Sequence, residues 1–260
     1  MLPTVHGDLY DYPKYYDLVY GSDWKAEVDF LNECFSRFAR GPVRRLFEPA
    51  CGTGRLMFRL ARAGYHVAGL DLNQRAVDFC NKRLQRHGLK PTAFVGDMAN
   101  FALQRPVDAA FNTINSFRHL STEAQAKGHL QSVARSLRKG GVYVLGLHLT
   151  PTAQPPLDEE SWSARRGNLS VLSRLWVIER DRRRRIERVG MSFDVYTPTR
   201  QFRIQGESSF RMYTAAQMQR LLAEVPELEV TSVHDFAYDA AKPTKIDGAA
   251  EDVIYVLRRK

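Results

Sequence analysis

Residues 46–54 read Leu46-Phe-Glu-Pro-Ala-Cys-Gly-Thr-Gly54, a short apolar strand that runs into a carboxylate and then a turn of small residues. A helix-like segment follows at 55–63, and a second apolar run at 65–70 ends in Asp71. This order predicts a β-α-β unit, whose turn faces a ligand at the carboxyl ends of parallel strands.

The glycines and the acid indicate the kind of ligand. Gly52 and Gly54 have no Cβ, so they allow close approach of the backbone and positive φ angles. Asp71 stands at the tip of the second strand, where it can accept hydrogen bonds from ribose hydroxyls. The sequence therefore predicts a nucleoside-containing cofactor.

Two side chains argue against a dinucleotide. The pattern G-x-G-x-x-G needs a third glycine, but Met57 occupies that position, and Glu48 would repel a pyrophosphate. S-adenosylmethionine has no phosphate and carries an ammonium and a sulfonium, so it favours a nearby carboxylate. The segment closely resembles the first motif of class I S-adenosylmethionine-dependent methyltransferases, with Ala50 where that family more often has glycine.

Three further segments resemble later motifs of this family, in the expected order. Phe94-Val-Gly-Asp97-Met98 resembles a third strand that ends in an acid, and 107–120 resembles the fourth motif. Residues 137–148 resemble the helix, glycine turn and fifth strand. The resemblance implies an α/β fold with a doubly wound, seven-stranded, mostly parallel, Rossmann-like sheet. Segments 228–236 and 253–257 would complete that sheet, the last strand antiparallel.

The sequence predicts three parts. Residues 1–40 form an N-terminal cover and an amphipathic helix capped by Asp23. Residues 41–149 and 214–260 form the cofactor-binding α/β domain. Residues 150–213 alternate in three runs and predict an antiparallel β-meander inserted over the substrate pocket.

The resemblance implies a set of cofactor contacts. Glu48 or the backbone of the glycine turn would hold the methionine end, and Asp71 the ribose. Asp97 would meet the adenine amino group, although Asp71 and Asp97 could each serve only as helix caps. The full set is Tyr16, Glu48, Ala50, Cys51, Gly52, Gly54, Asp71, Leu72, Asp97, Met98, Asn112 and Thr113.

Catalytic groups are harder to identify, because a methyl sulfonium is already an activated electrophile. A general base helps only when the acceptor arrives protonated. His119, after the fourth strand, and His148, at the end of the fifth, are candidate bases, and each has packing or capping as its alternative. Candidate substrate contacts are Asn115, Tyr196 and Tyr213. The other histidines lack partners at ligand spacing, so we expect no metal.

Composition bounds the cellular setting. No run of 18 apolar residues occurs, which argues against a transmembrane helix, and three cysteines without metal spacing favour a reducing cytoplasm. The formal net charge of +9 is concentrated partly in the arginine-rich run 180–188. That run indicates either a solvated hairpin tip or a contact surface for a polyanion.

We therefore expect a cytoplasmic methyltransferase acting on nitrogen or oxygen of a small molecule by direct in-line displacement. No Asn-Pro-Pro-aromatic or Asp-Pro-Pro-aromatic tetrapeptide follows the fourth strand, which argues against base modification. Alternatives are an RNA or protein methyltransferase that uses residues 180–188, an NAD-dependent oxidoreductase, or a non-catalytic cofactor-binding protein. The meander could also form a homodimer surface.

Overall fold

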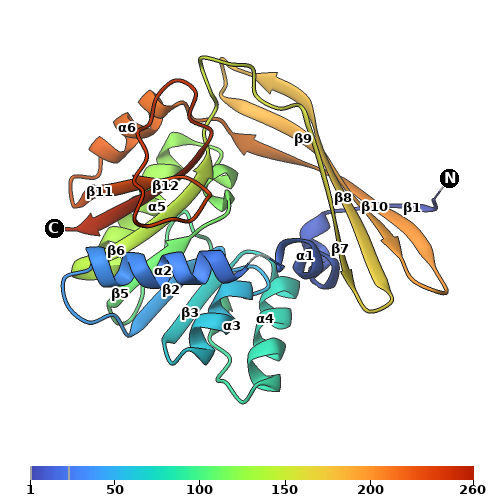
Figure 1. The fold of residues 1–260 in the computed structure, drawn as a ribbon, viewed down its shortest axis with the longest axis horizontal. Coiled ribbons are helices and arrows are strands. Elements are labelled where there is room, and N and C mark those ends of the chain that lie inside the picture. The colour runs from blue at the N-terminus through green and yellow to red at the C-terminus, as the bar shows by residue number, and fades with distance from the viewer. Residues whose placement is uncertain (1, 23) are drawn as a thin grey trace.

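The protein is built on two β-sheets, which the computed structural model describes for residues 2–22 and 24–260 (Figure 1). The expected helix cap Asp23 lies outside the described residues. The larger sheet carries the motifs of the sequence, and the smaller sheet stands beside it on the side where the parallel strands end (Figure 1).

The larger sheet has seven strands in the order β11-β12-β6-β5-β2-β3-β4. Strands β2, β3, β4, β5 and β6 are parallel to one another, whereas β12 is antiparallel to both β6 and β11. The predicted doubly wound fold is thereby confirmed. The strands are β2 (Arg45–Pro49), β3 (His66–Asp71), β4 (Ala93–Val95), β5 (Val107–Asn112), β6 (Leu137–His148), β11 (Leu228–His234) and β12 (Asp252–Arg259).

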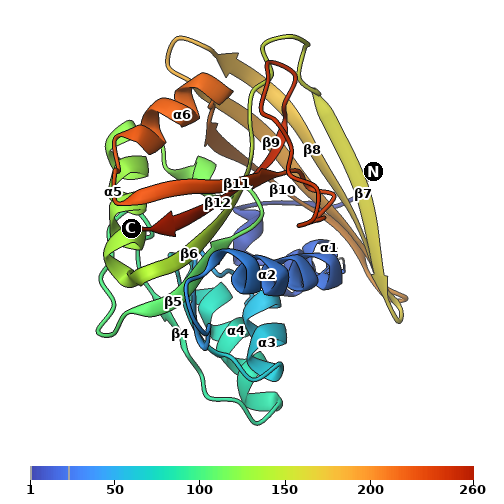
Figure 2. The ribbon, with the colours of Figure 1, turned by 60° about the vertical axis from the view of Figure 1, so that its left-hand side comes forward.

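Helices cover both faces of this sheet because successive strand residues point to opposite sides. Leu46 packs in the core under α2, α3 and α4, whereas its neighbour Phe47 packs under α5 and α6 (Figure 2). The helices are α2 (Trp24–Phe38), α3 (Arg55–Arg62), α4 (Gln74–Arg86), α5 (Glu123–Ser136) and α6 (Ala215–Ala223). Thr214 caps α6, as its position predicts, and Gln217 completes a capping box.

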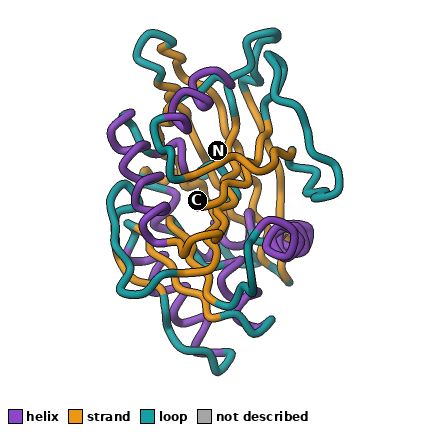
Figure 3. The backbone as a smooth tube through the Cα atoms, turned by 90° about the vertical axis from the view of Figure 1, so that its left-hand side faces the viewer, coloured by secondary structure: helices purple, strands orange, loops and turns teal. Residues whose placement is uncertain are grey.

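The smaller sheet has five strands in the order β1-β10-β9-β8-β7. Three of them, β8 (Leu169–Asp181), β9 (Ile186–Tyr196) and β10 (Gln201–Arg211), form the antiparallel meander that the alternation predicts. Strand β7 (Glu159–Arg166) extends it at one edge, and β1 (Thr4–His6) pairs in parallel with β10 at the other. The tube in Figure 3 follows the chain through both sheets, with strands in orange.

The N-terminal segment divides between the two sheets. Helix α2 packs against the larger sheet, whereas α1 (Pro13–Tyr20) contacts β7, β8 and α4. A short 3-10 helix, η1 (Leu9–Asp11), joins β1 to α1. The segment expected as one cover is thus part of the smaller sheet up to α1 and part of the larger sheet from α2.

The arginine-rich turn between β8 and β9 is only partly solvated. Arg182, Arg183 and Arg184 are exposed, as expected for a hairpin tip. Arg180 instead forms ion pairs with carboxylates, and the Arg185 guanidinium lies 4.9 Å from the centre of the Tyr213 ring. The two ends of the run therefore fix the hairpin to the body of the protein.

Candidate functional site

The loop after β2 adopts a left-handed backbone at three positions. The φ angles are +56° at Ala50, +52° at Gly52 and +67° at Gly54. A Cβ at Gly54 would collide with the sulfur of Cys80, whereas a Cβ at Gly52 would meet nothing within 4 Å. Gly54 thus lets the loop pack against α4, and Gly52 leaves open space in front of the loop.

Asp71 fixes the position of this loop. The Gly52 N–H donates to its Oδ2 and the Asn73 N–H to its Oδ1, each at 2.8 Å. Burial raises the pKa of the Asp71 carboxyl, and the two backbone hydrogen bonds lower it, with a net rise. The carboxyl ends of β2 and β3 are therefore joined at one point.

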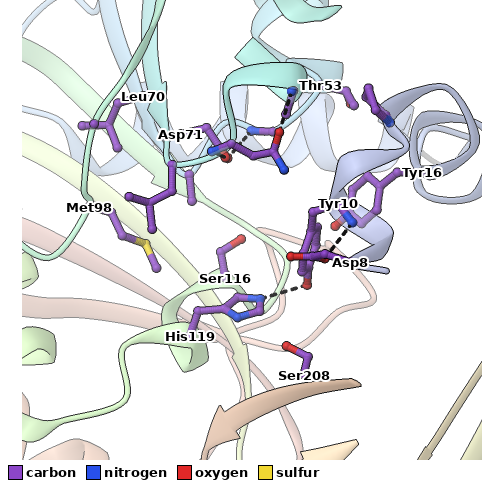
Figure 4. A pocket seen from close by; sticks show the side chains of 17 residues that line it. Asp8, Tyr10, Tyr16, Thr53, Leu70, Asp71, Met98, Ser116, His119 and Ser208 are labelled. Atoms are coloured by element: carbon purple, nitrogen blue, oxygen red, sulfur yellow. Dashed lines mark hydrogen bonds between the residues drawn. The ribbon is translucent and has the colours of Figure 1, made fainter. Parts of the chain in front are cut away.

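A first cavity of about 500 Å³ opens beside this junction. Figure 4 shows its polar rim at Asp71 and, on the opposite side, Tyr10 and His119. Its walls combine apolar side chains with backbone of the glycine loop. Among its lining residues are Tyr10, Pro13, Tyr16, Ala50, Gly52, Thr53, Leu70, Asp71, Leu72, Asn73, Ala76, Gly96, Met98, Ser116 and His119.

Half of the predicted cofactor contacts line this cavity: Tyr16, Ala50, Gly52, Asp71, Leu72 and Met98. The other half do not line it: Glu48, Cys51, Gly54, Asp97, Asn112 and Thr113. Asp97 is exposed and accepts from the Ala99 N–H at 2.8 Å in a turn, and no helix begins there for it to cap. Cys51 is buried behind the loop.

Glu48 requires a correction. Strand alternation places it on the same side of β2 as Leu46, under α3, where it accepts a hydrogen bond from the Met57 backbone. Its burial raises the pKa of the carboxyl well above the ordinary value. Met57, at the position of the third glycine, fits because Gly69 on β3 leaves room for its sulfur. Glu48 supports the loop from behind.

Asn112 and Thr113 also belong to a layer behind the cavity. The Asn112 amide donates to the Pro49 carbonyl at 2.7 Å, which joins β5 to β2. The Thr113 hydroxyl donates to Glu27 at 2.6 Å, and Glu27 forms a two-pronged ion pair with Arg55 of α3. Both side chains hold the strand ends together.

Helix α1 forms a cover over the first cavity and is anchored by Asp17. This buried carboxylate accepts from the Thr53 hydroxyl at 3.1 Å in the glycine loop. It also forms ion pairs with Arg83 of α4 and, at 3.7 Å, with Arg166 of β7. One side chain thereby connects α1 to both sheets.

A second cavity of about 600 Å³ lies between the two sheets. It shares four lining residues with the first cavity, namely Tyr10, Tyr16, Ser116 and His119. The two cavities therefore meet at this group of side chains, which comes from the N-terminal segment and from the 3-10 helix η2 (Ser116–His119) after β5.

His119 lies at the junction of the two cavities. Its Nε2 is 2.9 Å from the Tyr10 hydroxyl, and its ring packs on Phe210 with the ring centres 4.8 Å apart. Burial, with the nearby Arg118 charge, lowers the pKa of His119 to about 4. Burial raises the pKa of Tyr10 well above its ordinary value. Near pH 7 both partners are neutral.

His148 lies elsewhere in the second cavity. Its Nδ1 is 2.6 Å from Asp252 Oδ1, and its backbone N–H donates to Asn115 Oδ1 at 3.1 Å. Asn115 lines the same cavity, in a left-handed backbone conformation. Of the two candidate bases, only His119 also lines the first cavity.

Tyr196 and Tyr213 line neither cavity, which corrects their predicted role. Tyr213 is fully buried under the guanidinium groups of Arg185 and Arg211. Tyr196 is the last residue of β9, opposite Gln201, at the end of the hairpin.

The sequence argument missed Tyr10, Ser116 and most of the second cavity. Tyr10 belongs to an aromatic run, Tyr10 to Tyr20, whose residues share no periodicity that selects this one. Its hydrogen bond to His119 spans more than a hundred positions, which a single sequence does not reveal. Among the described residues, no three His, Cys, Asp or Glu side chains are placed to share a metal ion.

The chain matches a known family over the β-α-β unit and the strands that follow. Residues 47–141 match the family described as "Methyltransferase domain". This stretch of the chain is thus similar to a methyltransferase domain. The resemblance of the sequence motifs to this family is confirmed, and the fold agrees with it.

Several of the similar curated proteins are named as amino-sugar methyltransferases. Over 145 residues the chain is 30% identical to a dTDP-3-amino-3,4,6-trideoxy-alpha-D-glucopyranose N,N-dimethyltransferase of Streptomyces venezuelae. This match covers 56% of this chain and 58% of the relative. A dTDP-3-amino-3,6-dideoxy-alpha-D-glucopyranose N,N-dimethyltransferase of Streptomyces fradiae is 30% identical over 135 residues, half of each chain. The matches thus span between 50% and 58% of the length of these relatives.

Solved structures show that the fold extends over nearly the whole chain. An S-adenosylmethionine-dependent methyltransferase from Clostridium acetobutylicum aligns with a TM-score of 0.78 and 19% identity. That alignment covers 97% of this chain and 99% of the other. DesVI of Streptomyces venezuelae also aligns with a TM-score of 0.78, at 20% identity over 98% and 99% of the two chains. The smaller sheet is therefore part of a recurring architecture.

Proposed function

We propose that this protein is an S-adenosylmethionine-dependent methyltransferase that methylates a nitrogen of a small-molecule acceptor by direct in-line displacement. The observation that carries the proposal is the junction of the two cavities at Tyr10, Tyr16, Ser116 and His119. One cavity suits a nucleoside cofactor and the other an acceptor, so a methyl group has a short path between them. The names of the curated relatives support nitrogen over oxygen.

The first cavity fits S-adenosylmethionine in chemistry. The open space in front of Gly52 is what a ligand against the loop requires. Asp71 would accept hydrogen bonds from the ribose, and Leu72 and Met98 would flank the adenine. Tyr16 and Thr53 would lie at the methionine end. Its volume of about 500 Å³ is within the usual range for a small-molecule site.

S-adenosylmethionine, when bound, supplies a methyl group on a positively charged sulfur. The chain's own contribution is to align the acceptor and to exclude water. Tyr10 and Tyr16, on the N-terminal cover, close the junction from one side. The neutral Tyr10–His119 pair offers polar atoms at the junction that can orient an acceptor nitrogen.

His119 is proposed as a positioning group. With a pKa lowered to about 4, its imidazole is a weak base for an ammonium ion. An amine acceptor would thus have to reach the junction unprotonated. The His148–Asp252 pair, in the same cavity, is the candidate for receiving that proton.

An RNA or protein acceptor is not proposed. Arg180 and Arg185 are paired with carboxylates of the protein, which leaves the exposed part of the run at Arg182, Arg183 and Arg184. Within the described residues no helix is long and apolar enough to cross a membrane. We propose cytoplasmic residence, which the three buried free thiols support. A homodimer stays a proposal that light scattering would test.

The test is calorimetric titration with S-adenosylmethionine, S-adenosylhomocysteine and NADH. We expect the first two to bind and NADH not to bind. Asp71→Ala should weaken binding by about 1–3 kcal/mol through lost charge-assisted hydrogen bonds. Asp78→Ala removes an exposed acid of α4 outside the cavity and should leave binding unchanged. Binding of NADH alone would contradict the proposal, as would undiminished binding by Asp71→Ala.

Cofactor binding alone does not establish catalysis. The second measurement is mass spectrometry of amine, phenol and carboxylate acceptors incubated with cofactor and protein. We expect methylated amines. If the cofactor binds but none of these acceptors, nor a nucleotide amino sugar, is methylated, a non-catalytic cofactor-binding protein becomes the better explanation.

A further inference from the structure

The second cavity carries an excess of negative charge. Its lining includes the carboxylates of Glu160, Glu187, Glu251 and Asp252 and the guanidinium groups of Arg118 and Arg180. Among these six side chains, four carboxylates against two guanidinium groups leave a formal charge of −2. A cavity of this charge attracts cations and repels anions.

Both guanidinium groups already have protein partners. Arg118 donates to Glu187 at 2.6 Å and to the Arg211 carbonyl at 2.9 Å, and its side chain is only 8% exposed. Arg180 donates to the other Glu187 oxygen at 2.7 Å, to Asp158 and to the Leu157 carbonyl. Glu187 therefore neutralises part of both cations, and among the lining residues neither is left free to pair with a phosphate.

The remaining carboxylates are less fully compensated. Asp252 has His148 as its partner. Burial, together with the charges of Asp252 and Glu160, raises the pKa of Glu251, and His148 and Arg180 only partly oppose this rise. Glu251 thus lies close enough to Asp252 and Glu160 to be repelled by both in the same cavity, and a bound cation would relieve that repulsion.

Aromatic rings complete the cavity wall. The ring centres of Tyr16 and Tyr20 are 4.4 Å apart, and those of Tyr20 and Trp162 are 5.5 Å apart. All three residues line the second cavity. The face of an aromatic ring attracts an ammonium ion, most strongly where carboxylates are also near. The wall near the junction therefore suits an organic cation.

We propose that the acceptor is an organic amine that enters the second cavity as an ammonium cation and carries no diphosphate. The proposal rests on the proposed function, since it names the substrate class of the same site. It separates this chain from relatives whose names specify dTDP-linked amino sugars. In those substrates the amine is joined to a nucleoside diphosphate, an anion for which this cavity offers no free cation among its described lining residues.

The test measures charge preference independently of the natural acceptor. Calorimetry of the S-adenosylhomocysteine-saturated protein would use choline, its neutral tert-butyl analogue and thymidine diphosphate as probes. We expect choline to bind more tightly than the neutral analogue, and thymidine diphosphate to bind most weakly or not at all. A protein that fails to bind S-adenosylhomocysteine at all would refute the proposed function separately, and the three probes would then be compared without it.

Variants link the preference to the named acids. Glu160→Gln combined with Glu251→Gln should weaken choline binding by about 5-fold or more and leave the neutral analogue unaffected. Glu159→Gln removes the same charge from the same strand but outside the cavity, and should have no effect. Tighter binding of thymidine diphosphate than of choline would overturn the proposal. So would equal binding of choline and its neutral analogue, or choline binding that the double variant leaves unchanged.

A second arm uses turnover. Glucosamine and a nucleoside-diphosphate glucosamine present the same amine without and with the diphosphate. We expect methylation of the free amino sugar to exceed that of the nucleotide form in kcat/KM by about 10-fold or more. The reverse order would show that the diphosphate contributes to recognition and would overturn the proposal.

Discussion

Asp17→Asn tests whether one buried carboxylate holds the N-terminal cover in place. The substitution keeps the size of the side chain and an oxygen that can still accept from Thr53, but it removes the charge that faces Arg83. Removal of one partner of a buried ion pair costs about 3–5 kcal/mol, because the other charge is left buried. The Arg83 side chain is 17% exposed, so part of its charge can reach water. We therefore expect a loss of about 2–3 kcal/mol in the free energy of unfolding.

The assay is urea unfolding followed by circular dichroism, with S-adenosylmethionine affinity as a second readout. Arg166→Ala is the matched control, since Arg166 contacts the same carboxylate at 3.7 Å with a side chain 69% exposed. An exposed pair of this kind contributes about 0–1 kcal/mol. The reasoning fails if Asp17→Asn costs no more than the control. It also fails if cofactor affinity is unchanged, because α1 supplies Tyr16 to the first cavity.

Three further predictions concern the loop and the buried titratable groups. Glu48→Gln should stabilise the protein at pH 7 but not near pH 4, and it should leave cofactor affinity unchanged. The carboxyl of the unfolded chain ionises near pH 4.5, whereas burial keeps the folded carboxyl protonated well above that pH. Ionisation therefore favours the unfolded chain at pH 7, and glutamine removes that effect. Unfolding free energies at the two pH values check this, and loss of cofactor binding would instead place Glu48 at the ligand. Ala50→Gly should raise the melting temperature slightly. A left-handed alanine costs about 1–2 kcal/mol in the folded state, and the greater entropy of glycine in the unfolded chain offsets only part of the gain. A lower melting temperature would contradict this. His119 and His129 have pKa values lowered to about 4 by burial, so only the unfolded chain gains these protons below about 6.5, and stability should fall as the pH drops from there toward 4. Urea unfolding across that pH range measures the slope, and a flat profile would contradict buried, neutral imidazoles.

The sequence predicts the larger sheet well because its signals are local. Each strand of the β-α-β unit is a short apolar run that ends at a small or acidic residue, and Asp71 lies where such a run must end. The cofactor contacts that follow directly from this rule, such as Gly52 and Leu72, line the first cavity. Local pattern and three-dimensional position agree at these residues.

The predicted cofactor contacts that do not line the cavity depend on which face of the sheet each strand residue occupies. Glu48 is next to the glycine turn in sequence, yet alternation along β2 turns it toward α3 and away from the cavity. Thr113 likewise follows a strand end but pairs with Glu27 from the other side. Adjacency to a motif does not reveal which face of the sheet a side chain occupies.

Distant contacts account for most of what the sequence could not show. Strand β7 reads Glu-Glu-Ser-Trp-Ser-Ala-Arg-Arg, which is too polar to stand out, and β1 is only three residues long. Both become strands because the meander offers them an edge. The second cavity lies between the larger sheet and strands β7 to β10, so its lining could not be read from any single segment.

The pairing of β1 with β10 also determines when the binding site can exist during folding. Thr4 is aligned with Arg203, so the first strand of the protein must wait for nearly the last part of the meander before it is fixed. Tyr10 and Tyr16 follow β1 immediately and wall both cavities. Contacts between such distant parts of a chain pay a large loop-closure entropy and tend to form late. A partly refolded chain would therefore pair its parallel strands β2 to β6 before it could retain either ligand, and cofactor retention would report completion of the pairing between β1 and β10.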